Sequence, residues 1–177
     1  WRGGRRATRV GPRPDVTVGS RGGDPVNTGT PWLPPRRFLG ALGALGAPWA
    51  LALAASARLT AGLDVVVALA ASLGVSAVVH ELGHALGYWA LVERGAALGL
   101  RRGFGLALGV RTPRRDCERA VASAGPGLAA GLGLLVLVVD RFSLQSAQLL
   151  ALGLVLTGHV FGLLPGNDDG DRVWQVG

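Results

Sequence analysis

Residues 78 to 89 read VVHELGHALGYW, and they place two histidines and a glutamate inside a run that is otherwise almost wholly apolar. His80 and His84 are four residues apart, so a helix presents them on one face, one turn from each other. Two imidazoles placed in this way can share one zinc ion, and Glu81 beside them can take a proton from a water molecule that the ion acidifies. The spacing therefore predicts a zinc site with His80 and His84 as ligands and Glu81 as the general base.

The composition of the whole chain favours a membrane protein of one domain. Of the 177 residues, 49% are hydrophobic and 16% are charged, against roughly 25% charged residues in an average soluble domain. The net charge is +7 and every basic residue is an arginine. Aromatic residues make up only 6% and do not alternate with arginines, which argues against a nucleic-acid partner. The single cysteine, Cys117, excludes an intrachain disulfide and a cysteine-based zinc site.

Long apolar segments around the motif predict an all-α membrane protein with about four transmembrane helices. Twenty residues at about 1.5 Å per residue cross a hydrocarbon core of about 30 Å. The four segments are Phe38–Ala57, Asp64–Val92, Ala120–Val139 and Phe142–Leu164. A soluble helical bundle would need polar faces on its outer helices, and none of these segments has one. Between the second and third segments, residues 98–110 (LGLRRGFGLALGV) predict a short strand pair at the membrane interface.

The distribution of arginine predicts how the chain lies in the bilayer. Residues 1–37, rich in glycine, proline and arginine, are expected to form a disordered basic arm, and residues 38–177 the transmembrane domain. The arm contains eight arginines, the 93–119 loop contains seven and one follows the last segment, whereas only Arg58 and Arg141 lie on the other side. By the positive-inside rule, both termini and the 93–119 loop are expected to be cytoplasmic and to contact lipid headgroups. Because the chain begins with tryptophan and has no methionine, its true start is expected to lie elsewhere.

A third metal ligand is expected near the C-terminus, in residues 162–174 (GLLPGNDDGDRVW). Asp168, Asp169 and Asp171 follow Pro165, which ends a helix, and Gly170 permits a tight turn. The second and fourth segments both run toward the cytoplasm, so these carboxylates approach the same leaflet as the two histidines. The alternative interpretation of the cluster is a solvated turn at a helix end.

Together these residues resemble the site-2 protease family of intramembrane zinc metallopeptidases, the M50 type, over about residues 64–174. The resemblance rests on HELGH at residues 80–84, ASAGPG at residues 122–127 and LLPGNDDGDRVW at residues 163–174. It implies a zinc cofactor, Asp169 before Gly170 as the third ligand, and cleavage of a membrane-spanning protein substrate. No insert between the last two segments is long enough for a PDZ domain, so the chain resembles the compact members.

Two departures from the family pattern bear on the site. Gly162 stands where the family has asparagine, which removes whatever substrate or transition-state contact that amide makes. The stretch from Pro165 to Asp169 looks one residue shorter than usual, which leaves Asp168 as an alternative ligand. Only seven residues follow Gly170, so the final helix is expected to be truncated.

Two further features of the apolar segments have two interpretations each. His159 could donate a hydrogen bond to a substrate carbonyl or oxyanion near the zinc, or it is a packed histidine near a helix end. Gly125, Pro126 and Gly127 could break or thin the third helix so that a substrate strand or another helix comes close, or they serve ordinary helix packing.

These observations predict an intramembrane zinc endopeptidase. The alternative is a proteolytically silent homologue that binds a partner or a metal, suggested by the departures near Gly162 and Pro165. A soluble peptidase with the same motif is the third hypothesis, and the four long apolar segments argue against it. The substrate, the triggering signal and the oligomeric state do not follow from the sequence.

Overall fold

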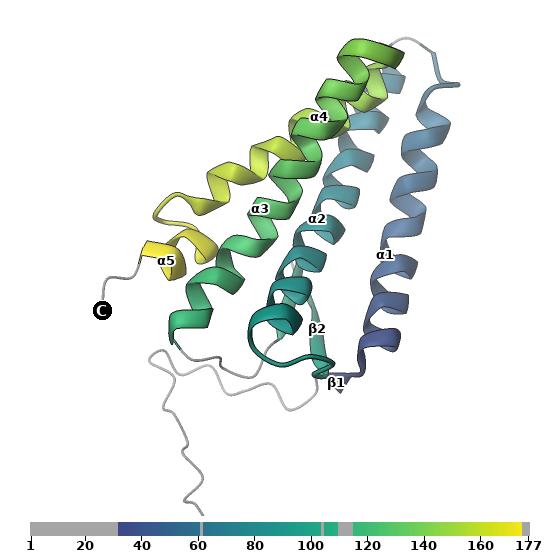
Figure 1. The fold of residues 1–177 in the computed structure, drawn as a ribbon. Helices are drawn as coiled ribbons and strands as arrows, with labels where there is room; N and C mark the ends of the chain where they lie inside the picture. The colour runs from purple at the N-terminus through teal and green to yellow at the C-terminus, as the bar shows by residue number, and fades with distance from the viewer. Residues whose placement is uncertain (1–31, 61, 104, 110–114, 175–177) are drawn as a thin grey trace, which may run out of the picture.

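A computed structural model describes residues 32–60, 62–103, 105–109 and 115–174 as a bundle of helices with a small sheet at one end (Figure 1). The elements in order are β1 (Trp32–Leu33), α1 (Pro35–Ser56), α2 (Leu63–Leu91), β2 (Leu98–Gly103), β3 (Gly105–Gly109), α3 (Arg115–Val139), the π-helical turn η1 (Asp140–Leu144), α4 (Ala147–Gly158), the 3₁₀ turn η2 (His159–Leu163) and α5 (Asp168–Trp174). Residues 1–31 of the predicted basic arm lie outside the described residues. Residues 32–37, which the sequence placed in that arm, contribute to β1 and to the first turn of α1.

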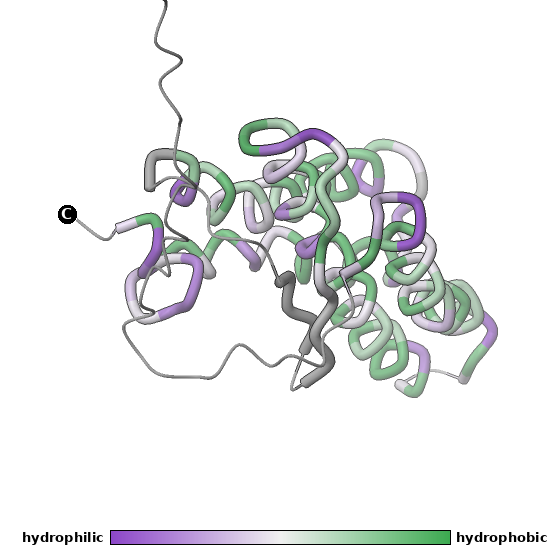
Figure 2. The backbone as a smooth tube through the Cα atoms, turned by 90° about the horizontal axis from the view of Figure 1, so that it is seen from below, coloured by the Kyte–Doolittle hydropathy of each residue, from purple (hydrophilic) through white to green (hydrophobic). Residues whose placement is uncertain are grey.

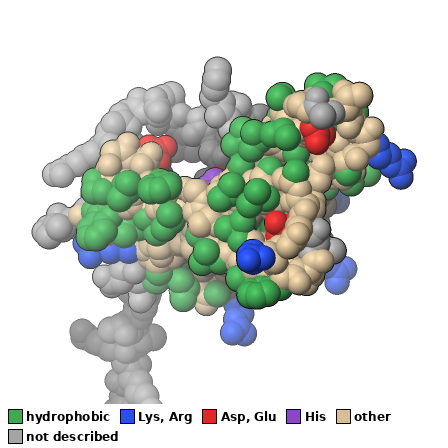
Figure 3. All heavy atoms as spheres, turned by 90° about the horizontal axis from the view of Figure 1, so that it is seen from above, with side chains coloured by type: hydrophobic (Ala, Val, Ile, Leu, Met, Phe, Trp, Pro, Cys, Tyr) green, Lys and Arg blue, Asp and Glu red, His purple; other side chains and the backbone are tan. Residues whose placement is uncertain are grey.

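Within the described residues, three helices are long and apolar enough to cross a membrane. They are α1, α2 and residues 117–143 of α3 and η1, with mean hydropathies of 1.7, 2.0 and 1.9. Their outward faces carry large apolar side chains, such as Leu51 at 71% exposed and Val66 at 63%. Figure 2 shows hydrophobic residues along the helices, and Figure 3 shows hydrophobic side chains over much of the face viewed. Such a surface is suited to lipid, because monomeric soluble proteins rarely expose large continuous apolar patches.

The fourth apolar segment differs from the single helix predicted for residues 142–164. It begins in the turn η1, continues as the short helix α4 and tightens into η2. After a break of a few residues α5 follows, and the two parts are bent by 45°. Pro165, which disfavours helical backbone in the residue before it, and Gly166 at φ +96° lie in the break. The segment counts as a fourth candidate span only if the bent pair is one span.

The small sheet joins α1 to the loop between α2 and α3. Strands β2 and β3 are antiparallel, with Gly99 opposite Gly109 and Gly103 opposite Gly105, and β1 pairs with the other side of β2. The strand pair thus lies within the 98–110 stretch, although residue 104 and residues 110–114 are outside the described part. Strand β3 contacts α2, so the sheet lies against the helix that contains the HELGH motif.

A compact apolar core packs the C-terminal part of α2 against its neighbours. The buried members come from α1, α2, β2 and α3, and they are Phe38, Leu42, Ala85, Tyr88, Leu98 and Val121. The ring of Phe38 meets that of Trp89 edge-on at a centroid distance of 5.9 Å. The indole nitrogen of Trp89 donates to the Ala96 carbonyl at 3.0 Å, which ties the end of α2 to the following loop. Because Ala85 adjoins His84 in the chain, this core holds the motif in a fixed position.

Candidate metal centre

Helix α2 presents the two histidines of the motif on one face, as their spacing predicts. The two Nε2 atoms lie 3.0 Å apart. The rings meet edge-on at a centroid distance of 4.6 Å. His84 is buried and His80 is nearly so. A helix 29 residues long spans about 43 Å at about 1.5 Å per residue, and His80 lies about 25 Å from its start. The pair is therefore well inside the apolar helix rather than at its end.

The turn after η2 brings Asp169 to the histidines. The Asn167 side-chain amide donates to the carbonyls of Phe161 at 3.1 Å and Leu164 at 3.3 Å. At the far end of α5 the Trp174 indole donates to the Leu163 carbonyl at 2.7 Å. Gly170 is buried against the backbone of Leu164, where a side chain would not fit. These contacts hold α5 folded back against η2.

Asp169 completes a triangle of possible ligand atoms with the histidines. Its Oδ2 atom lies 3.0 Å from His80 Nε2 and 3.3 Å from His84 Nε2. A tetrahedral zinc ion about 2.0–2.1 Å from each ligand separates the ligands by about 3.3 Å. The three observed separations of 3.0, 3.0 and 3.3 Å are close to that value, so the donor set fits zinc in both chemistry and spacing.

The tautomer of His84 is favourable for such a site. Its Nδ1 atom lies 2.7 Å from the Val121 carbonyl, which can only accept, so Nδ1 donates. A neutral ring that donates through Nδ1 has its lone pair on Nε2, the atom that faces His80 and Asp169. His80 Nδ1 is buried and has no hydrogen-bond partner among the described residues.

Glu81 follows His80 directly on α2, and the motif predicts it as the general base. Its position on the helix is about 60° round from His84 and about 100° from His80, at 3.6 residues per turn. The side chain is only 6% exposed. A buried carboxylate on the helix that contains both histidines has the chemistry to accept a proton.

His159 is the third histidine at the centre. It begins η2, and its ring lies 4.8 Å from the ring of His80, centroid to centroid, tilted by 32°. The rings are closer to parallel than to edge-on, so His159 faces the flat side of His80. It stands outside the group of three residues whose ligand atoms lie within 4.8 Å of one another. The placement puts a third imidazole next to one of the two ligand histidines.

The structure also bears on the alternatives that the sequence left open. Asp168 is exposed, and Asp169 is the neighbour that faces the imidazoles. Helix α3 runs without a break through Gly125, Pro126 and Gly127. Gly162 has open space at its Cα, since an added Cβ would meet Pro126 alone among the described residues, at 3.9 Å. The Val121 carbonyl, which accepts from His84, could not be found from the sequence, because any residue type offers a backbone acceptor.

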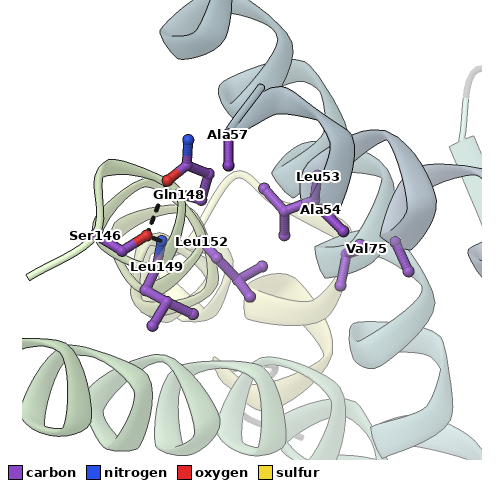
Figure 4. Close-up of a pocket in the computed structure, with 9 residues that line it drawn as sticks. Leu53, Ala54, Ala57, Val75, Ser146, Gln148, Leu149 and Leu152 are labelled. Carbon is purple, nitrogen blue, oxygen red and sulfur yellow. Dashed lines mark hydrogen bonds between the residues drawn. The ribbon is translucent and has the colours of Figure 1, made fainter. Parts of the chain in front are cut away.

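A cavity of about 400 Å³ lies apart from this centre (Figure 4). It is bounded by the C-terminal half of α1, by Val75 of α2 and by the start of α4. Its walls are mostly apolar, and Ser146 and Gln148, which are hydrogen-bonded to each other at 2.8 Å, contribute the polar groups. None of the ligand candidates lines it, so the cavity is separate from the metal centre.

No protein-family model, no curated protein and no solved structure matches this chain. The assignment of the site therefore rests on the residues and their geometry.

Proposed function

We propose that this protein is an intramembrane zinc metalloprotease that hydrolyses peptide bonds of membrane-spanning protein substrates. The observation that carries the proposal is the triangle of His80 Nε2, His84 Nε2 and Asp169 Oδ2 inside a bundle of apolar helices. Ionisable groups are costly within a membrane and are usually functional there. Two nitrogen donors and one oxygen donor are also a ligand set that catalytic zinc sites use, with the remaining position left for water or substrate.

Each residue has a defined task in this proposal. His80, His84 and Asp169 would hold the zinc ion. Zinc bound there supplies a Lewis acid that polarises the scissile carbonyl and lowers the pKa of the attacking water. Glu81 takes one proton from that water as its oxygen adds to the carbonyl carbon, and it then delivers a proton to the amine as the C–N bond breaks. One water molecule is consumed, and its two protons end on the released amine, so that a carboxylate and an ammonium group are formed.

His159 is proposed to stabilise the charge that develops on the carbonyl oxygen. Its ring is adjacent to His80, on the turn that leads to Asp169. In a 3₁₀ helix, residues i and i+3 lie on the same side, so His159 and Gly162 share one side of η2. The glycine leaves that side open, and an imidazole N–H beside it can reach a substrate oxygen.

The proposed arrangement in the membrane has four spans, with α4, η2 and α5 forming the bent fourth one. Both termini and the sheet would lie on the cytoplasmic side, with the sheet at the membrane interface. The excess of arginine in residues 1–37 and 93–119 supports this orientation. The metal centre would then be in the cytoplasmic half of the bilayer.

A proteolytically silent protein that binds a metal or a partner is the second candidate. Gly162 favours it, because the side of η2 nearest the histidines has no amide at this position. Such a protein would retain zinc through the same three ligands and would leave substrates intact.

The deciding experiment uses the purified chain reconstituted in lipid vesicles with a fluorescent single-span substrate. We expect zinc-dependent cleavage that Glu81→Gln lowers by at least about 100-fold, the lower end of the usual effect of a general base, while the zinc content stays unchanged. Glu93→Gln is the matched control, because Glu93 follows α2 and is exposed. Zinc binding without cleavage by the unchanged chain would favour the silent protein, and equal cleavage by the Glu81→Gln variant would remove Glu81 from the mechanism.

A further inference from the structure

The contact between α2 and α3 is unusually close where it passes the metal centre. A Cβ added at Gly83 would lie 2.5 Å from the Ala124 carbonyl oxygen and 2.8 Å from the Cα of Gly125. A Cβ added at Gly87 would lie 2.6 Å from the Cβ of Ala124. Small residues allow helix backbones to approach in this way within a membrane.

The imidazole of His84 occupies the space beside Gly125. A Cβ built at Gly125 would collide with Nε2 of His84, and it would lie 2.6 and 2.7 Å from Cε1 and Cδ2. The collision is therefore with the end of the ring that faces His80 and Asp169. On the other side of the ring, Nδ1 donates to the Val121 carbonyl, one helical turn before Gly125 on the same helix. Helix α3 thus holds the ring at Nδ1 by a hydrogen bond, and it leaves room for Nε2 because residue 125 has no side chain.

We propose that Gly125 is a positioning residue of the metal centre, because the absence of a side chain there sets the place of His84 Nε2. The inference rests on the zinc site of the proposed function. It assigns to this glycine a task other than breaking α3, which continues through it.

The required displacement decides the size of the effect. To reach ordinary contact at 3.4 Å, the two ring carbons must retreat by about 0.7–0.8 Å from an added methyl group. Zinc sites keep their ligand distances within about 0.2 Å of the ideal values. The ring cannot move by the larger amount without losing the Val121 hydrogen bond or leaving the triangle. Because disturbing a group that orients a ligand typically weakens metal binding by about 10- to 100-fold, we expect a loss in that range.

The test compares three alanine variants on the same helix. Gly125→Ala is expected to weaken zinc binding by at least about tenfold and to change the visible spectrum of the Co²⁺-substituted protein, which reports coordination geometry. Gly127→Ala is the matched control, since no described residue lies within 4 Å of its added Cβ, and it should bind as the unchanged chain does. Gly133→Ala would place its Cβ 2.5 Å from the backbone nitrogen of Thr157, far along α3, so it should lower thermal stability without changing the Co²⁺ spectrum.

Each outcome of the comparison has a separate meaning. If Gly125→Ala keeps the zinc affinity and the Co²⁺ spectrum of the unchanged chain, the inference is overturned and the proposed function stands. If the unchanged chain binds no zinc, both are refuted.

If the Gly125→Ala variant does not fold, a double variant with His84→Ala shows whether the collision is with the imidazole. If the collision is with the imidazole, removing the ring relieves it, and the double variant is as stable as His84→Ala alone. A double variant that still fails to fold shows that Gly125 serves helix packing only, which overturns the inference.

Discussion

Replacing Asp169 by asparagine removes one negative charge from the centre while keeping the shape of the side chain. The Oδ2 atom of Asp169 is 3.0 Å from His80 Nε2 and 3.3 Å from His84 Nε2. It is therefore about as close to the two imidazoles as they are to each other, at 3.0 Å. Structural zinc sites with four ligands bind with about 10–16 kcal/mol, or about 2.5–4 kcal/mol for each ligand. Since about 1.4 kcal/mol is a factor of ten, Asp169→Asn is expected to weaken zinc binding by about 100- to 1000-fold.

The assay is a competition titration in detergent against a chromophoric zinc chelator. Asp168→Asn is the control, because it makes the same chemical change one residue earlier at an exposed side chain. Its zinc affinity should match that of the unchanged chain within about threefold, since a solvated charge at this distance contributes little. The reasoning is refuted if both variants lose affinity equally, or if Asp168→Asn alone loses it.

Three further predictions concern other parts of the molecule. His159→Ala should retain zinc and lower cleavage by about 100-fold, the smaller of the usual effects of losing one oxyanion donor, and unchanged turnover would exclude that role. Cys117 is the only cysteine, so a membrane-impermeant maleimide should label it from the cytoplasmic side of sealed vesicles, and labelling from the outer side alone would reverse the orientation. Ala54→Leu fills part of the cavity between α1 and α4 and should raise the free energy of unfolding by about 0.5–2 kcal/mol. Ala44→Leu, at an exposed residue of α1 that does not line the cavity, should not, and an equal rise in both variants would exclude cavity filling.

The parts of the centre that follow from local spacing could be predicted from the sequence. The four-residue interval between His80 and His84 sets both on one face of any helix, whatever surrounds it. The inward direction of two apolar segments was enough to expect an aspartate near the histidines, and the structure places Asp169 there. Spacing alone did not choose between Asp168 and Asp169, because the choice depends on how α5 folds back under η2.

The parts that depend on packing between distant segments could not be predicted. The hydrogen bond from His84 to the Val121 carbonyl joins residues 37 positions apart, and the contact between His84 and Gly125 depends on how closely α2 and α3 approach. The 3₁₀ turn η2 in the fourth apolar segment was not predicted, because hydropathy does not register a change from α-helix to 3₁₀ turn. Pro165 and Gly166 indicate in the sequence where this turn ends, but they do not indicate that it starts at His159.

Diffraction from the zinc-loaded protein at the zinc absorption edge tests the metal centre most directly. We expect one anomalous peak enclosed by the two imidazoles of α2 and the carboxylate of Asp169, about 2.0–2.2 Å from each ligand atom. A peak on exposed acidic groups such as Asp168 and Asp171, with none between His80 and His84, would contradict the account.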